Sequence, residues 1–113
     1  MHELSITQSL LEIVLQQAEQ AHAGKVIKIN LTIGAMTGVV SDSVQFYLDI
    51  LTKGTIAEGA TVAFTIVPSR AKCRNCQQVF SLPEFDWTCP HCQGKIVDVI
   101  SGKELFVDSI EVE

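Results

Sequence analysis

Four cysteines in the second half of the chain have the spacing of a metal site. They form two Cys-x2-Cys pairs, Cys73-Arg-Asn-Cys76 and Cys89-Pro-His-Cys92, with 12 residues between the pairs. Each pair turns two sulfurs toward one centre, and two pairs supply the four thiolates that a tetrahedral Zn²⁺ ion prefers. The spacing therefore predicts a structural zinc site whose ligands are Cys73, Cys76, Cys89 and Cys92.

Other uses of these cysteines fit the sequence less well. Two disulfides need an oxidising compartment, of which the sequence gives no sign. A catalytic zinc ion needs an open coordination position, which four thiolates do not leave, whereas a rubredoxin-like iron site stays open on spacing alone. We expect His91, inside the second pair, to be exposed or to lie beside the ligands rather than to bind the metal. Arg74 and Lys95 are expected to offset the negative charge of the thiolates.

The first three residues, Met1-His2-Glu3, form a second candidate site. If Met1 keeps its free α-amine, this amine, the deprotonated amide nitrogen of His2 and the imidazole Nδ1 can form fused chelate rings around one metal ion. The amide nitrogen or carboxylate of Glu3 can supply a fourth donor. Nitrogen-rich, near-planar coordination suits Ni(II) or Cu(II) rather than zinc. By itself, however, a histidine after an initial methionine is more often incidental.

A helix is predicted directly after these residues. Apolar residues recur at helical spacing over residues 6–22, with glutamines and glutamates on the other faces. Ser5 or Thr7 can cap its start, and Gly24 is expected to take the left-handed conformation that ends it. The apolar positions are Leu10, Leu11, Val14, Leu15 and Ala18.

A second helix and three strands follow. The second helix is expected to open at Ser41 or Ser43, to close at Gly54, and to bury Val44, Tyr47, Leu48 and Leu51. Residues 25–33 alternate as in a half-buried strand that turns Ile27, Ile29, Leu31 and Ile33 inward. Residues 58–68 predict another strand with Val62, Phe64 and Ile66 on one face. Residues 104–112 predict a third, whose inward face is unclear because Phe106, Ile110 and Val112 share a parity with Asp108.

Charge and composition divide the chain into two modules. The chain has 8 basic and 13 acidic residues. Five of the basic and three of the acidic residues lie in the segment from Arg70 to Lys103, so the rest of the chain is strongly acidic. This segment also holds all four cysteines and is too short to be stable without a staple. We expect an α+β fold in which residues 1–68 and 104–113 form two helices on a three-stranded sheet. Residues 69–103 are expected to form an inserted, zinc-ribbon-like tetracysteine module.

The composition also limits the function. At 113 residues, with 47% apolar and 19% charged residues, the chain is expected to be one globular, cytoplasmic protein. It carries no apolar run long enough to span a membrane and no secretory signal pattern. The net charge of −5 argues against nucleic-acid binding.

Five stretches together resemble the HypA/HybF family of nickel metallochaperones for [NiFe]-hydrogenase maturation. They are "MHELSI", "INLTIGAMTGVV", "LTKGTIAEGA", "CPHC" and "SGKELFVDSIEVE". The resemblance implies that His2 is the essential nickel ligand, with Glu3 and the terminal backbone nitrogens contributing, and that the four cysteines hold zinc. It also implies two partners, the GTPase HypB and the precursor of the hydrogenase large subunit. Relatives often carry an acidic residue after the glycine of "IGAM", and Asp42 is a possible substitute for it here.

The sequence therefore predicts a non-enzymatic protein that carries Ni(II) at its N-terminus and has a structural zinc site. The main alternative is a zinc-ribbon protein that binds nucleic acid or acts as a scaffold, and this would need a basic face with exposed aromatic residues. An enzyme such as a zinc hydrolase lacks a nucleophile–base pair in this sequence. We expect a monomer or a weak homodimer, which could exchange the C-terminal strand.

Overall fold

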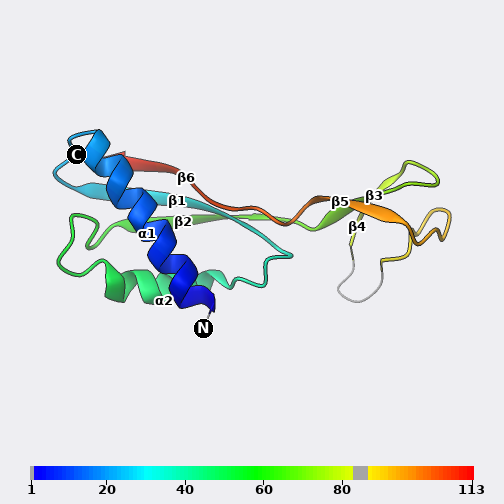
Figure 1. The fold of residues 1–113 in the computed structure, drawn as a ribbon, viewed down its shortest axis with the longest axis horizontal. Coiled ribbons are helices and arrows are strands. Elements are labelled where there is room, and N and C mark those ends of the chain that lie inside the picture. The colour runs from blue at the N-terminus through cyan, green and yellow to red at the C-terminus, as the bar shows by residue number, and fades with distance from the viewer. Residues whose placement is uncertain (1, 83–86) are drawn as a thin grey trace.

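Two three-stranded sheets lie end to end in an elongated molecule (Figure 1). The computed structural model describes residues 2–82 and 87–113, with side chains from residue 3 onward. Its extents along the principal axes are 55, 27 and 17 Å. Within the described residues, no helix combines the length and hydropathy that a membrane span requires.

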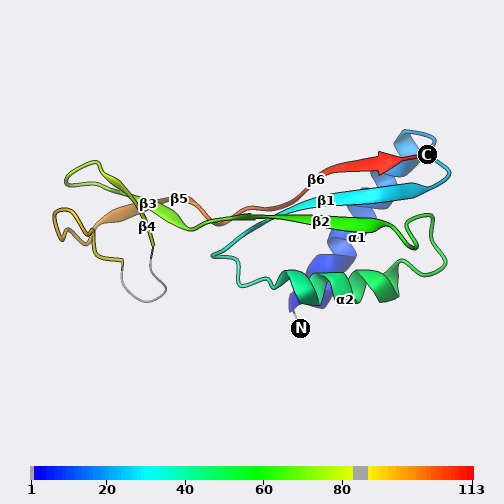
Figure 2. The ribbon, with the colours of Figure 1, turned by 180° about the vertical axis from the view of Figure 1, so that it is seen from behind.

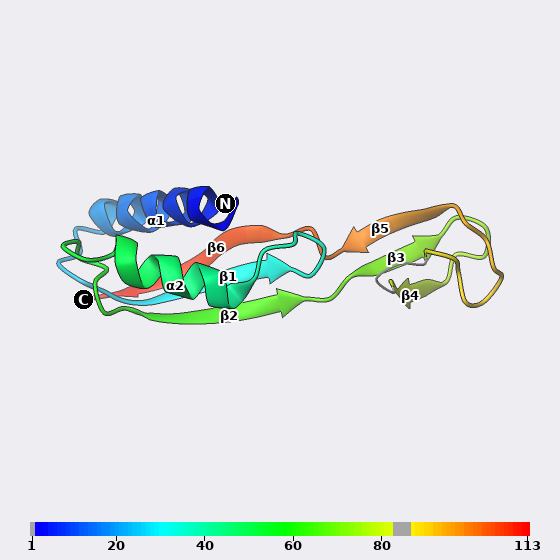
Figure 3. The ribbon, with the colours of Figure 1, turned by 90° about the horizontal axis from the view of Figure 1, so that it is seen from below.

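The first sheet has the order β2-β1-β6, and both helices pack on one of its faces (Figure 3). It is built from α1 (His2–Gln20), β1 (Val26–Gly34), α2 (Ser41–Leu51), β2 (Thr61–Val67) and β6 (Leu105–Val112). β1 pairs in parallel with β2 and antiparallel with β6. The predicted fold class, two helices on a three-stranded sheet beside a tetracysteine region, is confirmed.

The ends of α1 differ from the prediction. The helix begins at His2, so Ser5 and Thr7 lie inside it and do not cap its start. Its last residue is Gln20, and the left-handed residue that follows its end is His22, with a φ of 54°, and not Gly24. The amide of Ala23 donates to the carbonyl of Ala18 and that of His22 to Glu19, which is the Schellman pattern with a histidine in the usual glycine position.

A bulge in β1 corrects its predicted inner face. Val26 pairs with Val112 and Lys28 with Glu111, which leaves Ile27 as an extra residue. The extra residue reverses the alternation, so Val26 is buried whereas Ile27 is 41% exposed. The other predicted inward residues, Ile29, Leu31 and Ile33, are each 1% exposed and form the centre of the core.

A second bulge explains the unclear pattern of the C-terminal strand. Asn30 pairs with Ser109 and Leu31 with Val107, so Asp108 is an extra residue in β6. The parity changes at this point, and the residues of β6 that pack on the core are Leu105, Val107 and Ile110. Phe106 and Val112, which share the parity of Ile110, are exposed.

The second helix and β2 also depart from the prediction at their ends. Val40 is the N-cap of α2 and makes no side-chain cap hydrogen bond, so Ser41 is the first helical residue and Ser43 lies inside the helix. In β2, Val62 and Phe64 pack against the core as predicted. Ile66, at the end of this edge strand, is 53% exposed.

The second sheet is smaller and has the order β4-β3-β5. Its strands are β3 (Arg70–Cys73), β4 (Val79–Ser81) and β5 (Val97–Ser101), all antiparallel. No helix covers it in the described residues, and its buried cluster consists of Ala71, Cys73, Phe80 and Cys89. Half of this cluster is cysteine, so the sheet depends on the cysteines for its core.

The two sheets meet where the end of β1 touches the chain returning from the second sheet (Figure 2). The amide of Gly34 donates to the carbonyl of Glu104 at 2.6 Å, and the amide of Met36 donates to the carbonyl of Gly102 at 2.7 Å. A Cβ atom on Gly34 would lie 2.1 Å from the Gly102 carbonyl oxygen. Only glycine permits this approach of two backbones.

Candidate metal centres

The two Cys-x2-Cys turns have the same backbone hydrogen bonds. In the first turn, the amide of Cys73 donates to the carbonyl of Gln78, and the amide of Gln77 donates back to the carbonyl of Cys73. In the second turn, Cys89 makes the equivalent bonds with Gly94 and Gln93. Gln77 and Gln93 both take left-handed φ angles, of 65° and 62°. Two copies of one local turn thus present two sulfurs each.

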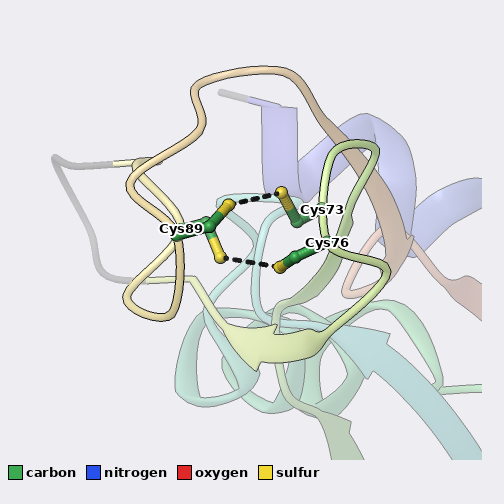
Figure 4. Close-up of side chains that lie close together, drawn as sticks. Cys73, Cys76 and Cys89 are labelled. Carbon is green, nitrogen blue, oxygen red and sulfur yellow. Dashed lines mark hydrogen bonds between the residues drawn. The ribbon is translucent and has the colours of Figure 1, made fainter.

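The four sulfurs form a compact cluster in which the two turns face each other (Figure 4). All four Sγ atoms lie within 4.8 Å of one another. The Sγ atoms of Cys73 and Cys92 are 3.5 Å apart, and those of Cys76 and Cys89 are 3.6 Å apart. A tetrahedron with Zn–S bonds of 2.3 Å has S–S edges of about 3.8 Å, so the cluster fits a four-thiolate zinc ion.

Backbone and amide groups surround the sulfurs closely. The His91 amide donates to Cys89 Sγ at 3.4 Å, and the Asn75 side-chain amide donates to Cys92 Sγ at 3.5 Å. Such bonds stabilise thiolates. A Cβ atom on Gly94 would lie 3.3 Å from the Sγ atoms of both Cys73 and Cys92. A side chain at position 94 would therefore require the two sulfurs to shift by a few tenths of an ångström.

The metal-free thiols differ in acidity. The pKa of Cys92 is lowered to about 6, first because of the Asn75 hydrogen bond and then because of the Gly94 amide. The pKa of Cys76 is raised to about 12: the Gln78 amide favours its thiolate, but burial and the neighbouring thiols outweigh this. Because Cys76 is protonated at neutral pH in the metal-free cluster, metal binding must displace its proton, and the affinity for the metal falls as the pH is lowered.

In the described residues, the group of side chains that could hold a metal ion contains the four cysteines and does not include His91. His91 is exposed, in line with the prediction. The guanidinium of Arg74, which was expected to offset the thiolate charge, makes a bidentate ion pair with Asp98 of β5 at 2.8–3.0 Å. This hydrogen bond holds the pKa of Asp98 below its usual value. The Arg74 charge thus supports the pairing of β3 with β5.

The structure describes the predicted nickel site only in part. Met1 lies outside the described residues, and so does the side chain of His2. The backbone of His2 opens α1, and Glu3 lies half-buried in the first turn. The first four amides of an α-helix have no partner in the helical ladder, so the amide nitrogens of His2 and Glu3 are not used by it. Asp42 is exposed in the first turn of α2.

Sequence reasoning missed residues that matter for their backbone or for a local bond. Gly34 and Gly102 are in the strings "IGAM" and "SGKEL", but only the fold brings them into contact. Gly94 occupies the same position relative to Cys89 as Gln78 does relative to Cys73. A glycine in only one of two otherwise similar turns was the sequence signal for the close approach of Gly94 to the sulfurs. Thr7 is of a residue type that caps helices, but its hydroxyl donates to the Glu3 carbonyl one turn earlier inside the helix.

Residues 1–112 match the family HypA, described as hydrogenase/urease nickel incorporation, metallochaperone. The chain belongs to the HypA family. The hydrogenase maturation factor HypA of Caldanaerobacter subterraneus subsp. tengcongensis is 47% identical over 115 residues and is covered completely, as is this chain. The hydrogenase maturation factor HybF of Salmonella typhimurium is 43% identical over 113 residues, again with complete coverage of both. The resemblance stated from the sequence is confirmed.

Solved HypA structures share the fold. The solution structure of the Ni metallochaperone HypA from Helicobacter pylori aligns with a TM-score of 0.67 and 20% identity, covering 97% of this chain and 96% of that one. A second HypA solution structure aligns with a TM-score of 0.73 and 22% identity, covering 100% and 97%. At these identities the structures support the arrangement of helices and sheets.

Proposed function

We propose that this HypA-family chain is a nickel metallochaperone that takes up Ni(II) at its N-terminus and delivers it during the maturation of [NiFe]-hydrogenase. The observation that carries the proposal is the match to the family over residues 1–112. The chain also begins with Met1-His2-Glu3, which offers an amine, two amide nitrogens, an imidazole and a carboxylate to one metal ion. Such a nitrogen-rich donor set favours Ni(II) over zinc.

The position of these donors suits a metal that must be given away. The amide nitrogens of His2 and Glu3 lie at the start of α1, where the helical ladder does not engage them. Amide deprotonation is costly, so the bound state is favoured only above a threshold pH and nickel stays exchangeable. The imidazole of His2 is the main ligand in this proposal, with Glu3 and the Met1 amine completing the set.

The cysteine cluster has the opposite role. Cys73, Cys76, Cys89 and Cys92 hold a permanent zinc ion, whose function is to fold the second sheet. Four thiolates leave no position for a substrate or an activated water, so we propose no catalytic role for this ion. Residues 69–103 then act as one folding unit, and residues 1–68 with 104–113 as another.

The family's role in hydrogenase maturation implies partner proteins in the same pathway. We propose the GTPase HypB and the precursor of the hydrogenase large subunit as these partners, in the cytoplasm. The basic segment that includes the cysteines is a candidate docking surface, because it differs in charge from the acidic remainder of the chain.

Nickel titration of three proteins tests the terminal site. They are the intact chain, the His2→Ala variant, and a variant with one residue added before Met1. Extension moves the amine away from His2 but keeps the imidazole, so we expect both variants to bind nickel at least tenfold more weakly. Equal affinity in all three proteins would refute terminal chelation.

A further inference from the structure

Thr7 is a polar residue on the buried face of α1. Its side chain is 0% exposed, and its hydroxyl donates a hydrogen bond to the carbonyl oxygen of Glu3, one turn earlier. The helical ladder gives the amide of Thr7 the same acceptor. The Glu3 carbonyl thus receives two hydrogen bonds from Thr7, in the turn that carries the proposed nickel donors.

The start of α1 is the part of the helix most prone to fray. The first four amides of any α-helix have no partners in the helical ladder, so the first turn depends on other contacts. Glu3 is the acidic residue of this turn, where a negative charge interacts favourably with the helix macrodipole. A second bond to the Glu3 carbonyl therefore acts where the helix is weakest.

We propose that Thr7 is a positioning residue for nickel binding. Each proposed donor, from the Met1 amine to the Glu3 amide and carboxylate, is attached before the Glu3 carbonyl along the chain. The hydrogen bond from Thr7 therefore fixes the backbone at the point where the donor-bearing residues join the helix. It uses the Glu3 carbonyl oxygen, which is not one of the proposed nickel ligands. The part of the chain that carries the proposed donors then starts from a fixed point of α1. The proposal rests on the terminal nickel site proposed above.

The chain contains a matched control. Thr52 also donates its hydroxyl to the carbonyl one turn earlier, that of Leu48, at 2.6 Å, and it is 6% exposed. It follows α2 at the C-terminal end, where no proposed nickel donor lies. Replacing Thr52 by valine removes the same kind of bond from an equally buried site, so it reports the purely structural cost.

Nickel titration of the full chain, followed by the absorption bands of bound Ni(II), separates the two roles. We expect Thr7→Val to weaken nickel binding about fivefold, the equivalent of one hydrogen bond. Thr7→Ser, which keeps the hydroxyl, should bind like the unmodified chain, and so should Thr52→Val, although thermal melting should show both valine variants to be less stable. Equal nickel affinity of Thr7→Val and Thr52→Val would overturn the proposal.

Hydrogen exchange on the unmodified chain provides a test that does not depend on a variant's folding. The Thr7 amide donates to the Glu3 carbonyl, so its protection should persist when nickel binds. Loss of this protection on nickel binding would overturn the positioning role. If the variant extended before Met1 bound nickel as well as the intact chain, the terminal site itself would be wrong. If only the extension weakened binding and Thr7→Val did not, the positioning role alone would be wrong.

Discussion

The sheets β2-β1-β6 and β4-β3-β5 have the same number of strands but differ in what covers them. Among the described residues, two helices cover the first, whose core contains eleven buried apolar residues. In the same part of the chain, the second has a core of four buried residues, two of them cysteines. A sheet of this size needs either a packed layer or a metal to be stable. The helices provide the packed layer for the first sheet, and the proposed zinc ion would provide the second sheet with the metal.

Zinc removal is the strongest way to test this contrast. Cys89→Ser, or a chelator, should abolish the folded second sheet, because structural zinc contributes about 10 kcal/mol or more in comparable small sites. Amide protection in the first sheet should remain, as measured by NMR hydrogen exchange with zinc content from native mass spectrometry. His91→Ala, which alters an exposed residue in the same turn, is the control and should keep its zinc. Simultaneous loss of both sheets would show a single folding unit.

Gly34→Ala tests the junction between the sheets. The new Cβ would lie 2.1 Å from the Gly102 carbonyl oxygen, so one backbone must move, at a cost of about 3 kcal/mol. Chemical denaturation should show this loss. Gly24→Ala is the control, because its Cβ meets only a carbonyl oxygen at 3.9 Å and should change the free energy of unfolding little. If Gly34→Ala were as stable as Gly24→Ala, the close approach at the junction would be wrong.

Leu31→Ala should affect the first sheet alone. Leu31 is 1% exposed in the central strand, and truncation of such a residue costs about 3 kcal/mol through lost contacts and a cavity. Urea unfolding followed by helical circular dichroism should report this loss. Zinc affinity, measured by competition with a chromophoric chelator, should not change. A parallel fall in zinc affinity would mean that the two cores are coupled.

The smallest expected effect is a gain in stability from glycine at left-handed positions. His22→Gly should stabilise α1 by about 1 kcal/mol, because glycine adopts the observed φ of 54° without steric cost. The rise should be visible in the melting temperature of the first sheet. Gln93→Gly, with a φ of 62° in the second cysteine turn, should instead raise zinc affinity. If His22→Gly lowered the melting temperature, the left-handed helix end would be refuted.

The success of sequence reasoning depended on how local each feature is. The cysteine turns are closed by hydrogen bonds within five residues of the chain, so their spacing alone was enough to predict a four-sulfur cluster. Alternation likewise predicted Ile29, Leu31 and Ile33 as core residues. The burial of Val26 instead of Ile27 was missed, because a bulge is defined by the partner strand and does not appear in the sequence of one strand.

Features that depend on distant contacts were beyond local patterns. Gly34 and Gly102 meet only because β6 returns beside β1. His22 takes the helix-ending position because the hydrogen bonds of the last turn place it there, although Gly24 has the better propensity. The proposed ligands of nickel stay a prediction from the residues and the family, because the described structure includes the backbone of His2 but not its side chain.

The return of β6 to the first sheet has a consequence for how the chain folds. β1 is the central strand, yet its antiparallel neighbour comes from the far side of the whole cysteine segment. During synthesis, β1 and β2 leave the ribosome before β6. The edge of β1 that pairs with β6 therefore has no partner strand until β6 has been made. Zinc capture shortens the loop that must close before β6 can pair, and it lowers the entropic cost of that closure. Zinc supply should therefore set how fast a newly made chain completes the sheet beneath α1.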